Sequence, residues 1–185
     1  MKRSTIKNAL SNVVFVLAIA ALIYGPSREW IMRQIAFSPS IEKEQDRETI
    51  TDKDWKLIGL NTANINFEAL EGEIVFVNFW ATWCPSCRAE KPMMEKLYQD
   101  YKDKVAFLFV TNENWPTVQN YYSKKKYNFP TYNSQGRPPE FFTRTNSIPA
   151  TYIIDKNGAV VVSKVGAADW NSKKTRQLLD DLLKN

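Results

Sequence analysis

Residues 79–90 read FWATWCPSCRAE, and this stretch holds both cysteines of the 185-residue chain. Cys84 and Cys87 have the spacing at which two thiols can close into a disulfide and open again. The chain contains no histidine, so the two thiols cannot complete a four-cysteine or cysteine–histidine zinc site, and a cysteine–histidine nucleophilic pair is excluded as well. Two-thiol redox chemistry remains, or two-coordinate binding of a soft metal ion.

The residues on either side place the cysteines where a strand passes into a helix. Residues 73–80 are apolar and rich in β-branched and aromatic side chains, which predicts a short buried strand. Residues 88–101 have a helix-forming composition, and Pro85 suits an opening helical turn, where its missing N–H is not needed. The positions spaced four apart on one face of this helix are Met93, Leu97 and Tyr101.

A position at a helix N-terminus has a chemical consequence for the two thiols. The unpaired N–H groups and the positive end of the helix dipole favour a thiolate, so Cys84 is expected to have the lower pKa and to attack. Cys87 lies one turn deeper and is expected to be more buried and to act as the resolving thiol. A purely structural disulfide is the alternative, but so short a loop constrains the unfolded chain little.

The run FWATWCPSCRAE resembles the active-site stretch of membrane-anchored thioredoxin-like proteins of the TlpA/ResA type. The resemblance covers roughly residues 50–185. It implies an α/β thioredoxin-like fold, in which helices flank a mixed central sheet that carries an N-terminal β-hairpin extension. It also implies protein disulfide oxidoreductase activity that needs no cofactor and no metal beyond the redox-active cysteine pair.

A second landmark is Pro149, which precedes an apolar run typical of a strand. By resemblance Pro149 is the cis proline that faces the two cysteines in thioredoxin-like folds; a trans proline at a strand start is the alternative. The backbone of the preceding residue would then pair with a bound substrate strand. The substrate-binding residues predicted around the cysteines are Trp83, Pro85, Ser86 and Ile148.

The proton acceptor is expected on the helix that follows the cysteines. Asn78 stands where thioredoxin carries a buried aspartate, and an amide cannot exchange a proton with the deeper cysteine. Glu90 follows Cys87 by three residues, on the same helix face, and ResA-like proteins carry a glutamate at this spacing. We assign Glu90 as the acceptor of the Cys87 proton, with a solvated helix carboxylate as the alternative. Lys91 departs from the family, in which an apolar residue is frequent at this place.

An apolar segment at the N-terminus predicts a membrane anchor. Residues 13–24 are too short by themselves for a spanning helix of about 20 residues, but residues 6–24 suffice if Lys7 snorkels. We expect an uncleaved signal anchor, and a cleaved signal peptide is the alternative. Lys2 and Arg3, with Lys7, would hold the N-terminus in the cytoplasm. The catalytic domain would then lie on the periplasmic side of a bacterial inner membrane, attached by a single span.

The chain is expected to divide into residues 1–41, the anchor and juxtamembrane segment, and residues 42–185, the thioredoxin-like domain. Residues 28–37 suggest a segment lying on the membrane surface, and residues 38–49 a charged linker. The net charge is +5, but residues 1–41 carry five basic side chains against one acidic, so the basic balance gives no reason to infer nucleic-acid binding.

Strands and helices alternate along the rest of the chain. The expected elements are a hairpin from 55–60 and 65–67, a strand at 105–110, a helix at 117–127, a short strand at 129–132, a hairpin from 152–155 and 159–165, and a helix at 172–183. This order favours a mixed sheet flanked by helices.

The leading functional hypothesis is a membrane-tethered thiol–disulfide oxidoreductase in which Cys84 attacks a partner disulfide and Cys87 displaces the partner. By resemblance the substrates are disulfide-containing periplasmic proteins, such as apocytochrome c before haem attachment, and a membrane thiol-transfer protein supplies the electrons. The alternative is a non-enzymatic module that binds and delivers Cu(I) through the two thiolates. A thiol peroxidase is disfavoured because position 81 is alanine, where such an enzyme needs a threonine.

Overall fold

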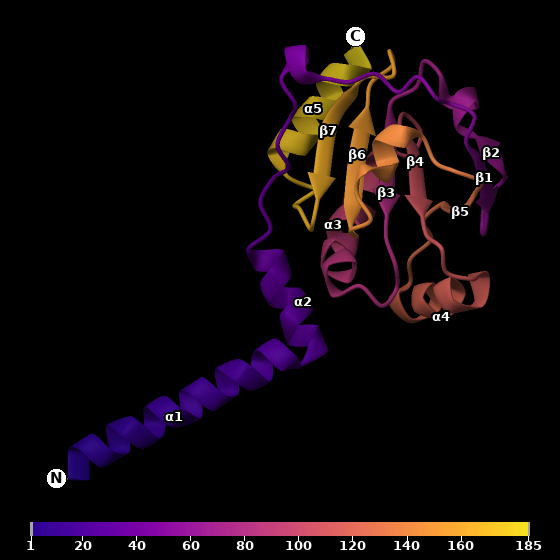
Figure 1. Ribbon diagram of the computed structural model, residues 1–185. Coiled ribbons are helices and arrows are strands. Elements are labelled where there is room, and N and C mark those ends of the chain that lie inside the picture. The colour runs from indigo at the N-terminus through magenta and orange to yellow at the C-terminus, as the bar shows by residue number, and fades with distance from the viewer. Residues whose placement is uncertain (1, 185) are drawn as a thin grey trace.

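The computed structural model describes the backbone of residues 2–184 and the side chains of residues 10–20, 24 and 26–184. Its centre is a seven-stranded sheet with the order β2-β1-β5-β4-β3-β6-β7 (Figure 1). The strands are β1 (Lys56–Gly59), β2 (Ile65–Asn66), β3 (Val75–Phe79), β4 (Ala106–Val110), β5 (Thr131–Gln135), β6 (Ala150–Ile154) and β7 (Val160–Val165). The β3–β4 and β4–β5 pairs are parallel and the others antiparallel, so the sheet is mixed, as predicted.

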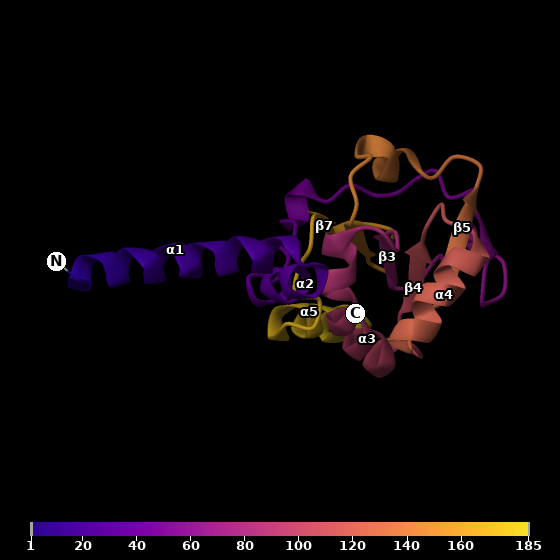
Figure 2. The same cartoon turned by 90° about the horizontal axis from the view of Figure 1, so that it is seen from below.

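The helices are α1 (Lys2–Ile23), α2 (Gly25–Gln34), α3 (Pro85–Tyr101), α4 (Trp115–Lys125) and α5 (Lys173–Lys184), and the 3-10 segments are η1 (Glu44–Asp46), η2 (Phe67–Leu70) and η3 (Glu140–Arg144). Helices cover one face of the sheet, and 3-10 segments cover the other. Figure 2 shows α3, α4 and α5 on one side of the sheet, where their apolar side chains pack with Phe76 and Phe109. On the other side, Val77 and Leu108 pack with side chains from η2 and η3.

The two central strands set the position of the cysteines. β3 and β4 are almost wholly buried because helices or 3-10 segments cover both faces of the sheet there. They run parallel with Phe79 opposite Val110, so the loops that leave their carboxyl ends lie at the same edge of the sheet. One of these loops leads into Cys84 and α3, and the other leads through Glu113 into α4.

The predicted N-terminal hairpin is confirmed. β1 and β2 pair antiparallel, with Leu57 opposite Ile65, and β1 continues the sheet by pairing with β5. The turn between them is tight, since a Cβ on Gly59 would lie 2.0 Å from the carbonyl oxygen of Thr62. Glycine is therefore the residue that permits this close approach of the backbone.

The segment predicted to be a charged linker, residues 38–49, is paired at two points with the edge of the sheet. The Glu42 N–H donates to Val161 O at 2.9 Å, and the Val160 N–H donates to Glu48 O at 2.8 Å. Pro39 is buried, and Ile41 packs against the core. An edge strand leaves a row of unpaired N–H and C=O groups, and on β7 this segment satisfies part of that row. We call residues 38–49 the edge segment.

The segment predicted to lie on a membrane surface, residues 28–37, forms most of α2, which packs on the domain. The Arg33 Nε donates to Ala89 O at 3.3 Å, and Glu29 forms an ion pair with Arg88. Both partners lie in the first turns of α3, close to the cysteines. Trp30 remains 59 % exposed. Contact of α2 with a bilayer stays a prediction.

Ahead of α2, α1 extends away from the domain (Figure 1). Within the described part of the chain, no helix combines the length and the apolar character that crossing a bilayer requires.

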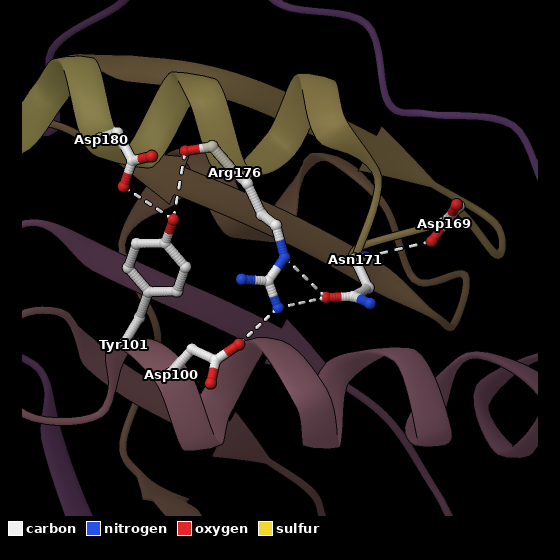
Figure 3. Close-up of polar contacts among 6 residues, drawn as sticks. All are labelled: Asp100, Tyr101, Asp169, Asn171, Arg176 and Asp180. Atoms are coloured by element: carbon white, nitrogen blue, oxygen red, sulfur yellow. Dashed lines mark hydrogen bonds and ion pairs between the residues drawn. The ribbon is translucent and has the colours of Figure 1, made fainter.

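The last helix is fastened to α3 by polar side chains (Figure 3). The Arg176 guanidinium lies 2.5 Å from Asp100 and donates to Asn171 Oδ1, and Tyr101 Oη donates to Asp180 at 2.7 Å. Burial, with the Asp180 hydrogen bond, raises the pKa of Tyr101 to about 12, so it remains a donor at neutral pH. These contacts hold the turn before α5, residues 166–172, against α3.

Candidate active site

The two cysteines stand at the start of α3 and form a disulfide, with their Cα atoms 5.3 Å apart. Cys84 is the N-cap residue, and its Sγ accepts the Cys87 backbone N–H at 3.2 Å. The first N–H groups of a helix lack partners within the helix, and here a sulfur supplies one. The same N–H stabilises a thiolate on Cys84 when the disulfide opens.

Cys87 is more buried than Cys84, as expected from its place one turn inside the helix. Cys84 keeps 4 % of its surface exposed, and Cys87 is fully buried. Trp83, just before Cys84, is 68 % exposed and lies at the rim, whereas Trp80 belongs to the core. A sulfur of another molecule can therefore reach Cys84 but not Cys87.

The loop before β6 closes over Cys84. The Ile148–Pro149 peptide bond is cis, as predicted. The carbonyl oxygen of Ile148 lies 3.8 Å from Cys84 Sγ, so its backbone is next to the sulfur that faces outward. The Pro149 carbonyl is occupied, since it accepts the Gly166 N–H at 2.8 Å.

A groove runs along the carboxyl edge of β3 and β4 beside Cys84. One hollow of about 280 Å³ is lined by Ala81, Trp83, Glu113 and Ile148, among others. A second hollow of about 400 Å³ shares Phe79, Val110, Asn112 and Ile148 with the first and continues along residues 134–147. Pro85 and Ser86 are half-buried in the first turn of α3 and line neither hollow. Trp83 and Ile148 are thus the predicted substrate-binding residues that line the groove, and Cys84 itself lines neither hollow.

Glu113 holds the turn that leads into Cys84. Its carboxylate accepts the Thr82 backbone N–H and the Thr82 hydroxyl, each at 2.6 Å. The two residues are far apart in sequence and meet because the loops after β3 and β4 leave the same edge of the sheet. Sequence reasoning did not identify Glu113, and no local pattern marks it.

Glu90 is fully buried behind the disulfide, on the turn of α3 that follows Cys87. Its Oε2 accepts from Trp170 Nε1 at 2.9 Å and from the Ala168 N–H at 3.3 Å, and its Oε1 accepts from Asn78 Nδ2 at 3.2 Å. Burial raises the pKa of Glu90 to about 7, although these hydrogen bonds and Lys91 act to lower it. The alternative of a solvated carboxylate is wrong.

Trp170 was also missed by sequence reasoning. It is fully buried in the turn before α5, and its indole N–H reaches Glu90 because Arg176 fastens that turn to α3 (Figure 3). A carboxyl group whose pKa lies near neutrality, one helical turn from a buried thiol, can take up and release a proton in the physiological range.

Comparison with known proteins agrees with this geometry. A redoxin family profile matches residues 44–182. The chain belongs to the redoxin family. It is 32 % identical over 126 residues to the thiol-disulfide oxidoreductase ResA of Halalkalibacterium halodurans, covering 67 % of this chain and 68 % of that protein. It is 31 % identical over 132 residues to the thioredoxin-like protein YneN of Bacillus subtilis, covering 69 % and 75 %.

Among solved structures, a putative thiol:disulfide interchange protein DsbE from Chlorobium tepidum superposes with a TM-score of 0.62 at 22 % identity, over 78 % of this chain and 99 % of that one. This redoxin is thus a thioredoxin-like thiol–disulfide oxidoreductase of the TlpA/ResA type. The structure brings most of its predicted site residues to one place: Trp83, Cys84, Cys87, Glu90, Ile148 and Pro149. Their individual roles stay predictions.

Proposed function

We propose that this redoxin is a membrane-tethered reductant of disulfides in periplasmic proteins. The observation that carries the proposal is a single arrangement: a disulfide at a helix N-terminus, with Cys84 beside a groove and, one helical turn after Cys87, a buried carboxyl group of near-neutral pKa. A substrate needs access to one sulfur only, while the second sulfur needs a proton acceptor and protection from solvent.

The proposed reaction begins with the reduced pair. The Cys84 thiolate attacks one sulfur of the substrate disulfide; the substrate S–S bond breaks, and the departing substrate thiolate takes a proton from water. Glu90 then accepts the Cys87 proton, and the Cys87 thiolate attacks Cys84 Sγ. The Cys84–Cys87 bond forms, and the second substrate thiolate leaves. Two electrons have passed to the substrate, and a membrane thiol-transfer protein must return two by donating its own dithiol.

The groove is the proposed site for the substrate chain. Its walls combine apolar side chains, such as Trp83 and Phe79, with the Ile148 backbone, which is placed to pair with an extended segment. Cysteine pairs in extended, unfolded chains suit such a groove. Apocytochrome c before haem attachment is a proposed substrate of this kind.

The tether is proposed to be α1. Its described middle exposes apolar side chains, among them Leu10, Phe15 and Leu17, which are unfavourable in water. Lys2, Arg3 and Lys7 precede them in sequence, which favours a cytoplasmic N-terminus. The domain then lies on the periplasmic side of the inner membrane.

Trapping tests the function directly. In the full chain, Cys87→Ser stops the reaction after Cys84 has attacked, so envelope proteins with disulfides should accumulate as adducts that a thiol reductant releases. Cys84→Ser is the matched control, since Cys87 is fully buried and should trap nothing. Equal trapping by both variants, or by neither, contradicts the proposal.

The direction of electron flow has its own test. Equilibration of the pair with glutathione should give a potential more reducing than about −180 mV, the value for protein disulfide isomerase. A more oxidising value contradicts a reductant role. The Cu(I)-delivery alternative has no observation in its favour, and tight copper binding without turnover of a disulfide substrate would support it instead.

A further inference from the structure

A lysine lies in the core directly behind the redox site. Lys91 on α3 is fully buried, and its Nζ lies 4.0 Å from the ring centroid of Trp80, 4.2 Å from that of Phe109 and 5.0 Å from that of Phe129. A buried ammonium loses its hydration, and only specific partners offset that loss. Aromatic faces supply part of the compensation. The remainder comes from Asn78, whose Oδ1 accepts a hydrogen bond from Nζ at 3.1 Å.

Asn78 joins this ammonium to the Glu90 carboxylate. Its Nδ2 donates to Glu90 Oε1 at 3.2 Å and to Thr151 Oγ1 at 2.8 Å, while its Oδ1 faces Lys91. A carboxamide can do both, because it has a donor end and an acceptor end. An ionised aspartate at this position would set a second negative charge against Glu90. When both groups are ionised, the amide connects opposite charges that together bury no net charge.

We propose that Lys91 is a positioning residue of the redox site, whose buried ammonium, acting through the Asn78 carboxamide, favours the ionised form of Glu90 that accepts the Cys87 proton. The inference deepens the proposed function and rests on it for the role of Glu90.

The groups facing Lys91 and Glu90 are few. On α3 itself, the carboxylates of Glu90 and Glu95 raise the pKa of Lys91, although burial lowers it well below its usual range. Tyr98 on α3 and Tyr122 on α4 have pKa values raised by burial and stay neutral. The remaining neighbours come from β3 and the residue after it, from β4 and β6, and from the turns before β5 and α5. They are uncharged: Asn78, Thr151, Trp80, Phe109, Phe129, Ala168 and Trp170. Lys91 is therefore the cation that acts on Glu90.

The test is an infrared titration of the Glu90 carboxyl band in the full chain, with the disulfide intact and Glu90→Gln as the spectral reference. Lys91→Met keeps the length of the buried side chain and removes its charge. A nearby opposite charge commonly moves a pKa by about 1 unit, so the pKa of Glu90 should rise by about that amount. The ionised fraction at pH 7 then falls about fivefold.

Lys96→Met is the matched control, since Lys96 lies on the same helix and is exposed; it should leave the Glu90 titration unchanged. An unchanged titration in Lys91→Met overturns the inference. Should Lys91→Met fail to fold, the reciprocal measurement decides. Coupling between two sites acts equally in both directions, so Glu90→Gln must lower the pKa of Lys91. The Lys91 pKa is measured from lysine Nζ resonances in NMR spectra. An unchanged Lys91 pKa overturns the inference as well.

Kinetics separate an electrostatic role from a structural one. In Lys91→Met the rising limb of the exchange rate against pH should move to higher pH, with the wild-type rate regained on the alkaline plateau. A structural role lowers the rate at every pH without moving the limb, and that result contradicts the inference. The titrations need no turnover. A chain without exchange activity would therefore contradict the proposed function, while the infrared and NMR results would still test the coupling between Lys91 and Glu90.

Discussion

Glu90 shows how burial changes the chemistry of a single carboxyl group. On the surface of α3 it would be ionised at any pH above 5 or so; fully buried, it has a pKa of about 7. Its three hydrogen bonds stabilise the charged form only in part, because loss of hydration remains the largest influence on its pKa. The same side chain can therefore hold or release a proton at neutral pH.

The raised pKa predicts how stability depends on pH. Between its ordinary value of 4.5 and about 7, Glu90 binds a proton more tightly in the folded chain than in the unfolded one. The folded state therefore gains stability from Glu90 below pH 4.5 and loses it as pH rises through 7. Relative to Glu90→Gln, the wild-type free energy of unfolding should fall by up to ~3 kcal/mol over this range. Urea unfolding of both chains at the two ends checks this, and a constant difference contradicts it.

A second prediction at this scale concerns Glu113. Glu113→Ala leaves the Thr82 N–H and hydroxyl without their acceptor, which should cost about 1–3 kcal/mol of stability. Because Thr82 leads into Cys84, the rate of exchange with a disulfide substrate should also fall. Urea unfolding and insulin reduction measure the two effects. Glu73→Ala is the control, since Glu73 is exposed; equal losses in both variants would contradict the assigned role.

Among the elements, the edge segment differs most from the structure that its composition predicts. Its charges and Pro39 are typical of a linker, yet it pairs with β7 through Glu42 and Glu48. The partner groups lie on the last edge of the sheet, which has no further strand of its own. An element of this kind is stabilised by a surface that forms only once β6 and β7 have paired.

Proline substitution tests that pairing. Glu42→Pro removes the N–H that donates to Val161 O, so the free energy of unfolding should fall by about 1–3 kcal/mol. Lys43→Pro is the neighbouring control, because Lys43 already has a φ of −63°, which proline adopts without strain. Thermal unfolding of the two variants should differ clearly. Similar melting temperatures would show that the edge segment adds little stability.

At the scale of the whole molecule, the redox site lies at the edge of the sheet where β3 and β4 end, and α2 packs beside it. The contacts of Glu29 and Arg33 with α3 place α2, the helix that follows α1, beside the start of α3 and its disulfide. If α1 anchors the chain as proposed, Cys84 is carried close to the membrane, within reach of a membrane-bound electron donor.

Labelling in cells tests the proposed location. After mild reduction of cells with a permeabilised outer membrane, a membrane-impermeant maleimide should modify Cys84 in the full chain, and Cys84→Ser should show little labelling because Cys87 is fully buried. Membrane fractionation should retain the chain after a salt wash. Labelling that requires lysis of the inner membrane, or release of the chain by salt, contradicts the location.

Local patterns account for much of this fold. The apolar run before Cys84 and the helix-forming run after it predicted β3 and α3, and two strand-like runs around a turn signal at residues 156–158 predicted the hairpin β6–β7. Each depends on residues close together in the chain, so their side-chain periodicity carries the information. The order of exposure of Cys84 and Cys87 follows from the same local geometry, because one residue begins the helix and the other lies a turn inside it.

Contacts across long sequence distances were beyond such reasoning. Glu113 reaches Thr82, Trp170 reaches Glu90, and Lys91 enters an aromatic core only because the sheet brings separate loops and strands together. Burial is a property of that assembly, and burial is what moves the pKa of Glu90 towards neutrality. The residues at the cysteines thus specified which bond this protein makes and breaks, whereas the packing around them specified the burial that raises the pKa of Glu90.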